Sequence, residues 1–225
     1  MKPMNDKHFA ILRRQMVELI EIQVELMSDE LGQEALSEQV LAAMRRVPRH
    51  LFVAPSLASL AYQDTPLPIG FDKTISQPFI VALMTDLLAP QRHESVLEVG
   101  TGLGYQTAVL AELADHVWSV EIVEELGSHA QMRLQQLGYS TIDIRIGDGS
   151  RGWIEHAPYD KILVTAAAEQ PPAALLEQLQ PGGRLVLPLG PADAQRLTVI
   201  DKDAVGQTRT RDLIPVRFSL LETVI

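Results

Sequence analysis

The stretch Val96–Tyr105 most constrains what this chain can fold into, because it joins a short apolar segment to a glycine-rich loop and then to a second segment of helical character. Gly100, Gly102 and Gly104 remove the side chains that would keep a ligand away from the backbone. The apolar run before them is typical of a buried strand in a parallel sheet. The sequence therefore predicts a strand, a loop that approaches a ligand closely, and a helix.

The spacing of these glycines separates two kinds of nucleotide site. A dinucleotide-binding fingerprint reads G-x-G-x-x-G and requires its third glycine at position 105, where this chain has Tyr105. Glu98 in the predicted strand gives the pattern E-x-G-x-G-x-G instead. This pattern resembles the first motif of the class I S-adenosylmethionine-dependent methyltransferases. NAD stays open as an alternative cofactor that the glycine spacing disfavours.

Two acidic residues end the next predicted strands. Glu121 lies 21 residues after Gly100, where a carboxylate in a Rossmann-like site accepts hydrogen bonds from ribose hydroxyls. Asp148, between Gly147 and Gly149, is suited to bind the exocyclic amine of adenine. Each acid also has a structural interpretation, Glu121 at a helix N-terminus and Asp148 in a turn. Their order at successive strand ends favours a nucleoside cofactor.

Alternating strand and helix patterns after Pro78 predict an α/β fold with a mostly parallel, doubly wound sheet. The resemblance of the glycine motif implies that this fold is the Rossmann-like one of class I methyltransferases. An N-terminal helical segment and a C-terminal antiparallel hairpin complete it. Breaker residues predict an irregular segment from Pro55 to Lys73. We expect strands at 95–99, 116–121, 141–146, 161–165, 184–188, 196–201 and 213–221, and helices at 9–27, 36–44, 79–88, 105–113, 122–137 and 173–179. Gly138 is expected to cap the helix before it.

Length and composition limit the class of protein. The 225 residues predict one domain, with residues 1–47 as the helical segment and 74–190 as the cofactor-binding core. No apolar run reaches the roughly 20 residues of a membrane-spanning helix, and Met1–Lys7 lacks the apolar core of a secretory signal, so a cytoplasmic protein is expected. A net charge of −10 disfavours a nucleic-acid partner. The histidines show no metal-ligand spacing.

Further motifs resemble the protein-L-isoaspartate O-methyltransferase family. Together with the glycine loop they are Val40–Val53, Ala61–Tyr62, Pro66–Gly70, Asp72–Ala82, Gly147–Gly149, Ala157–Asp160 and Pro181–Gly190. The resemblance implies S-adenosylmethionine as cofactor and a peptide or protein carboxylate as substrate. Specifically, it implies methylation of the free α-carboxyl of L-isoaspartyl residues in damaged proteins, the first step of their repair.

By this resemblance Ser76 is the active-site residue and orients a carboxylate oxygen. A carboxylate is already a nucleophile, so catalysis is expected to consist of alignment in a water-poor site. Ser76 also has the sequence context of a helix N-cap, and both roles can hold together. The residues expected to bind the cofactor are Thr74, Ile75, Ser76, Gln77, Glu98, Gly100, Thr101, Gly102, Gly104, Glu121, Asp148 and Gly149, and those beside the peptide are Thr165, Ala166 and Ala167.

Departures from the family pattern leave alternatives open. The chain has Ser219-Leu220-Leu221 where the family has Val-Pro-Leu after an aromatic residue, and Phe79 where Tyr or His is usual. One alternative is therefore a related methyltransferase for another carboxylate. Another is a catalytically silent cofactor-binding module with a protein partner. The apolar N-terminal helix predicts a homo-oligomer contact, and the basic cluster Arg45–His50 is interpreted as an interaction with a helix dipole.

Overall fold

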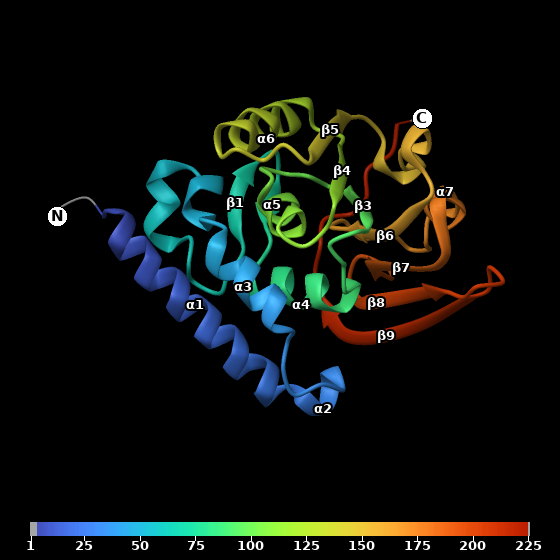
Figure 1. Ribbon diagram of the computed structural model, residues 1–225, viewed down its shortest axis with the longest axis horizontal. Helices are drawn as coiled ribbons and strands as arrows, with labels where there is room; N and C mark the ends of the chain where they lie inside the picture. Colours follow the sequence, from blue (N-terminus) through green and yellow to red (C-terminus); the bar gives the residue numbers. More distant parts are fainter. Residues whose placement is uncertain (1–3, 225) are drawn as a thin grey trace.

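The computed structural model describes residues 4–224, in which helices pack on both faces of a central sheet (Figure 1). Outside this range lie Ile225 and Met1–Pro3, and the latter belong to the segment that was predicted to lack a secretory signal. The sheet has the order β5-β4-β3-β6-β7-β8-β9, with parallel pairing from β5 to β7 and antiparallel pairing from β7 to β9. The predicted Rossmann-like architecture is confirmed. The strands are β3 (Ser95–Val99), β4 (His116–Glu121), β5 (Ile142–Ile146), β6 (Tyr159–Val164), β7 (Leu179–Leu189), β8 (Gln195–Lys202) and β9 (Thr208–Val216).

Capping residues mark the start of the first helix and the end of α6 (Glu124–Gln136). Asn5 and His8 form a capping box at the start of the first helix, with the His8 N–H donating to Asn5 Oδ1 at 3.2 Å. Gly138, with φ of 86°, follows the end of α6, and the Tyr139 N–H donates back to the Leu134 carbonyl at 3.1 Å, so the predicted capping role of Gly138 is confirmed. No helix in residues 4–224 is long and apolar enough to cross a membrane. The helices are α1 (Asp6–Leu26), α2 (Ser28–Leu31), α3 (Glu38–Arg46), α4 (Pro78–Leu88), α5 (Tyr105–Ala111), α6 (Glu124–Gln136) and α7 (Ala173–Gln178).

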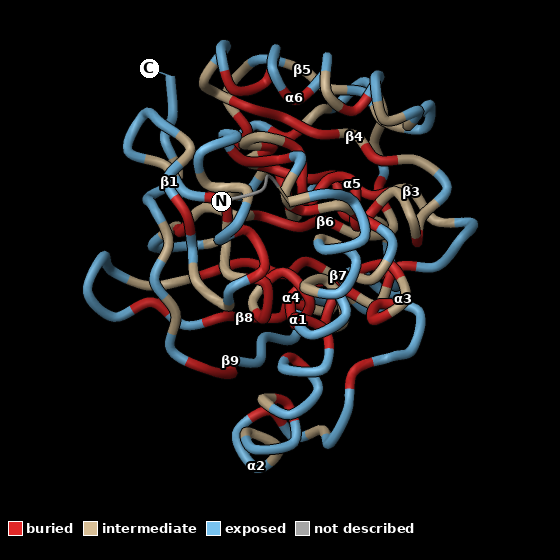
Figure 2. Tube along the Cα trace, turned by 90° about the vertical axis from the view of Figure 1, so that its left-hand side faces the viewer, coloured by how far each residue is buried: buried red, intermediate tan, exposed pale blue. Residues whose placement is uncertain are grey.

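Side chains that alternate along the strands build a separate hydrophobic cluster on each face of the sheet. Val96 of β3 packs in the cluster that contains the buried faces of α1, α3, α4 and α5. Its neighbour Leu97 packs in the other cluster, together with Leu175 of α7 and Tyr159. Figure 2 shows the buried residues gathered along the central strands and α4. The N-terminal helices therefore share one core with the sheet.

Two predictions for irregular or terminal segments were wrong. Residues 55–73 contain a 3-10 helix (Pro55–Leu60) and most of a small antiparallel sheet of β1 (Leu67–Gly70) and β2 (Lys73–Ile75). The breakers Pro68 and Gly70 pair within β1, and Phe71 and Asp72 form the hairpin turn, both with the positive φ of a type I′ turn. The last strand spans Thr208–Val216 and not 213–221, because the chain after Val216 leaves the sheet and lines a cavity.

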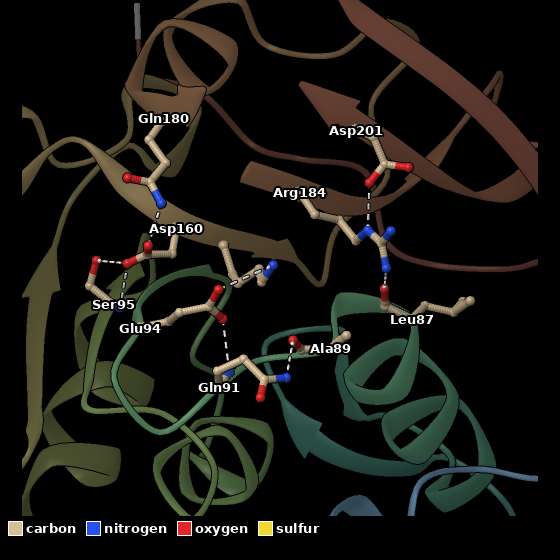
Figure 3. A network of polar contacts seen from close by, with 10 residues as sticks. Leu87, Ala89, Gln91, Glu94, Ser95, Asp160, Gln180, Arg184 and Asp201 are labelled. Atoms are coloured by element: carbon tan, nitrogen blue, oxygen red, sulfur yellow. Dashed lines mark hydrogen bonds and ion pairs between the residues drawn. The ribbon is translucent and has the colours of Figure 1, made fainter. Parts of the chain in front are cut away.

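A polar network at the amino-terminal edge of the sheet fixes the strands and α4 relative to one another (Figure 3). Asp160 accepts hydrogen bonds from the N–H and the hydroxyl of Ser95, at 2.8 and 3.1 Å. Arg184 donates from Nε to Asp201 at 2.6 Å and from Nη1 to the Leu87 carbonyl at 2.8 Å. Because Leu87 lies in the last turn of α4, this network holds the helix whose other end borders the cavity.

Candidate active site

A cavity of about 770 Å³ lies at the carboxyl ends of the parallel strands. Its size falls within the roughly 300–1,000 Å³ of small-molecule sites. Its walls are the ends of β3, β4 and β6, the segment that joins β2 to α4, and the C-terminal tail, which we define as residues 217–224. The chain passes from β3 to one side of the sheet and returns through β6 on the other, so the cavity occupies the switch point where open α/β sheets bind ligands.

The glycine loop after β3 forms one wall by close backbone contact. Gly100 has φ of 96°, and a Cβ there would lie 2.3 Å from Thr165 Oγ1 at the end of β6. The Thr165 hydroxyl donates to the Gly100 carbonyl at 2.7 Å, which joins the two strand ends. Gly100, Gly102 and Thr165 line the cavity, whereas Gly104 caps α5 behind it. The loop thus presents bare backbone to a ligand.

Glu121, at the end of β4, lines the cavity beside this loop. Its Oε2 accepts from the Gly102 N–H at 2.7 Å and its Oε1 from the Val123 N–H at 3.0 Å. Each carboxylate oxygen can accept a second hydrogen bond. Glu121 therefore fixes the loop and keeps acceptor capacity for hydroxyl groups of a ligand.

Glu98 lies behind the loop and is not among the residues that line the cavity. Its Oε2 accepts from the hydroxyls of Thr107 and Ser119, each at 2.6 Å, and Ser119 is also 2.6 Å from the hydroxyl of Thr101. Complete burial raises the pKa of Glu98 to about 8, although these hydroxyls act in the opposite direction. Glu98 and the buried Thr101 therefore support the loop from beneath.

The tail covers Asp148, and only its neighbour Gly149 lines the cavity. Asp148 accepts from the N–H of Ser150 at 2.9 Å and from the N–H of Val224 at 3.1 Å. Desolvation opposes ionisation, but the Ser150 hydroxyl, these two N–H groups and the charge of Arg151 hold the pKa of Asp148 below its usual value. Gly149 packs against β3, since a Cβ there would lie 2.3 Å from Val99 Cγ1.

The segment before α4 brings Thr74, Ser76 and Gln77 to the cavity, whereas Ile75 is buried in the hydrophobic core. The N-cap of α4 is Gln77, so the N-cap interpretation of Ser76 was wrong. The reason is Pro78, which occupies the first helical position and makes the residue directly before it the cap.

Arg49 and Asp64, which the sequence analysis did not assign to the site, hold this segment at two points. Arg49 is fully buried and donates from Nη2 to the Ser76 carbonyl at 2.7 Å. Asp64 accepts from Gln77 Nε2 at 2.6 Å and from the Phe79 N–H at 2.8 Å. The helix-dipole interpretation of the basic cluster is wrong for Arg49, which faces the core. No sequence spacing indicated either role, because the partners are distant in the chain.

The tail forms the remaining wall along the segment after β6. Ala167 donates to the Ser219 carbonyl at 2.8 Å and accepts from the Leu221 N–H at 2.7 Å. Ala166 lines the cavity, whereas Ala167 is buried. Ser219 and Leu220, two of the residues that depart from the family pattern, line the cavity. Phe79, another such residue, packs in the core.

The sequence matches a known family over most of its length. The profile described as protein-L-isoaspartate(D-aspartate) O-methyltransferase matches residues 22–223. A protein-L-isoaspartate O-methyltransferase 1 from a Polaromonas species is 53% identical over 97% of this chain and 93% of its own. A protein-L-isoaspartate O-methyltransferase 2 from Syntrophobacter fumaroxidans is 50% identical over 95% of this chain and 87% of its own.

Solved structures share the fold. One protein-L-isoaspartate O-methyltransferase superposes with a TM-score of 0.79 at 25% identity, over 92% of this chain and 65% of that longer chain. A putative family member from Plasmodium falciparum, solved with S-adenosyl-L-homocysteine, has a TM-score of 0.77 at 21% identity, over 94% of this chain and 99% of its own. The chain therefore belongs to the protein-L-isoaspartate O-methyltransferase family.

Proposed function

We propose that this protein transfers a methyl group from S-adenosylmethionine to the free α-carboxyl of L-isoaspartyl residues in damaged proteins or peptides. The observation that carries the proposal is the meeting of the glycine loop, Glu121 and Ser76 at one cavity. Family membership supplies the reaction class.

The residues of the cavity fit an adenosyl sulfonium cofactor. The bare backbone at Gly100 and Gly102 admits a flat ligand, and Glu121 can accept hydrogen bonds from ribose hydroxyls. The cofactor carries no phosphate, so the loop does not have to bind a pyrophosphate. The bound cofactor supplies an electrophilic methyl group on a positively charged sulfur.

Catalysis by this chain consists of positioning and exclusion of water. Ser76 donates to one oxygen of the substrate carboxylate and so aligns the other with the methyl group. Arg49 holds the Ser76 carbonyl and fixes the backbone. No general base is needed, because the carboxylate is already ionised. Positive and negative charge cancel as the ester forms, so the apolar walls contributed by Ile69, Ile80 and Leu126 favour the reaction.

The test is methyl transfer from labelled cofactor to an isoaspartyl peptide and to its normal aspartyl twin. We expect label in the first peptide only. Equal labelling of both peptides contradicts isoaspartyl specificity. Ser76→Ala should lower kcat and leave the affinity for S-adenosylhomocysteine near the wild-type value.

The tail residues Ser219 and Leu220 favour a second candidate, methylation of another carboxylate, because they line the cavity and depart from the family pattern. In that case the isoaspartyl peptide stays unlabelled and a small carboxylic acid accepts the label. Tight cofactor binding without turnover on any carboxylate indicates the silent binding module instead.

We also propose that α1 forms a homodimer contact. Exposed apolar side chains lie along its outer face, and basic residues in its first half precede acidic residues in its second half, so an antiparallel second copy brings opposite charges together. Ile22→Glu should convert a dimer to a monomer by light scattering, and a wild-type monomer at high concentration contradicts the proposal. The apolar residues are Ile11, Leu19, Ile22 and Leu26.

A further inference from the structure

The lining of the cavity includes one ion pair that the mechanism above does not use. Lys73 Nζ lies 2.5 Å from Glu222 Oε1. Lys73 begins β2 and lies three residues before Ser76, whereas Glu222 comes from the tail, 149 residues away. The cavity therefore already contains a carboxylate paired with a lysine. This lysine belongs to the segment that carries the proposed active-site serine.

The backbone of the tail is fixed on both sides of this glutamate. The Leu221 N–H donates to the Ala167 carbonyl at 2.7 Å, and the Val224 N–H donates to Asp148 at 3.1 Å. These hydrogen bonds hold the tail in place without help from the ion pair, so Glu222 can release Lys73 while the tail stays docked.

Exposure of the pair indicates that it opens at low cost. The side chain of Lys73 is 22% exposed and that of Glu222 is 54% exposed. Ion pairs open to water contribute little to stability, because solvent screens them. Stabilisation of the fold alone is therefore a weak reason for a lysine and a glutamate to line a ligand cavity.

On the basis of the function proposed above, we propose that Lys73 binds the carboxylate of the incoming substrate. Glu222 pairs with this lysine as an internal competitor until the substrate binds. A chain with a net charge of −10 repels an anionic substrate at long range, which makes a cation in the same cavity as Ser76 valuable for capture. Among the residues that line the cavity, the other carboxylate, Glu121, is held by backbone N–H groups, and the other cation is Arg217.

Two charge-removing variants separate this proposal from a purely structural ion pair. Lys73→Gln removes the cation, and Glu222→Gln removes the competitor. We expect the KM for the isoaspartyl peptide to rise about threefold to tenfold in Lys73→Gln and to fall by a similar factor in Glu222→Gln, with kcat changed less than twofold. A structural clasp predicts the same direction of change in both variants, because each breaks the same pair. Shifts in the same direction, or no shift in either variant, overturn the proposal.

Three further variants control for charge and folding. Glu38→Gln removes an exposed glutamate that lies 2.6 Å from Arg45 and outside the cavity, so it should leave KM unchanged. Lys73→Arg should restore most of the affinity. Arg217→Gln tests the rival cation, and a rise of KM in this variant with none in Lys73→Gln overturns the proposal.

An equilibrium measurement distinguishes failure of this proposal from failure of the proposed function. The isoaspartyl peptide is titrated into each variant saturated with S-adenosylhomocysteine, and calorimetry gives Kd without turnover. Wild-type protein that turns over no peptide contradicts the proposed function. Opposite shifts of Kd in Lys73→Gln and Glu222→Gln support the carboxylate site even then, whereas equal Kd values or undetectable peptide binding in all variants overturn it.

Discussion

Replacement of Glu98 by glutamine should make the protein more stable at alkaline pH relative to wild type. Burial raises the pKa of Glu98 from its model-compound value of 4.5 to about 8. Between these values the folded protein keeps a proton that the unfolded chain has lost, so the wild-type free energy of unfolding falls as pH rises toward 8. The difference of about 3.5 pH units corresponds to an upper limit of roughly 5 kcal/mol, at 1.36 kcal/mol per unit.

The assay is urea unfolding of wild type and Glu98→Gln at pH 5, 7 and 9. Glutamine keeps an acceptor for the hydroxyls of Thr107 and Ser119 but cannot ionise. The stability of the variant minus that of wild type should therefore increase by several kcal/mol from pH 5 to pH 9. The exposed Glu38→Gln serves as control and should show no such trend. Parallel stability curves for Glu98→Gln and wild type refute a buried carboxyl with a raised pKa.

Three further substitutions test the walls of the cavity. Glu121→Ala should weaken binding of S-adenosylhomocysteine by about 1–3 kcal/mol in calorimetry, because the Gly102 N–H and the ligand lose a charged acceptor, and unchanged affinity contradicts this assignment. Arg49→Met should lower kcat by about tenfold or more in the methylation assay, because the Ser76 carbonyl loses its hydrogen-bond donor. A kcat equal to that of wild type shows that Arg49 supports only the fold. Gly100→Ala should lower both the midpoint of thermal unfolding and cofactor affinity, because its Cβ would meet Thr165 Oγ1 at 2.3 Å, and a fully stable variant argues against the close packing of the two strand ends.

The sequence was most informative where the signal is local. Alternating apolar residues and breakers placed the strands that flank Gly100 and Glu121 within a few residues, because strand periodicity and glycine conformation act over short distances. The hairpin between β1 and β2 was missed because Pro68 and Gly70, which pair within β1, were interpreted as breakers. Its turn residues, Phe71 and Asp72, are not a pair typical of positive φ.

Contacts between distant parts of the chain could not be predicted. Glu98 and Val99 are neighbours in one strand, and the side chains of neighbouring strand residues point to opposite faces of the sheet. Val99 lines the cavity, so Glu98 points away from it. Asp148 was predicted from its place at a strand end, but the tail that covers it lies 76 residues further along the chain. Arg49 bonds to a backbone carbonyl, which leaves no pattern of residue types to recognise.

Calorimetric titration of S-adenosylhomocysteine into the purified protein tests most directly whether the cavity bordered by Gly100, Gly102 and Glu121 is an adenosyl site. One molecule should bind per chain, and Glu121→Ala should weaken that binding. Absence of binding at millimolar ligand, or equal affinity in wild type and Glu121→Ala, contradicts the cofactor site.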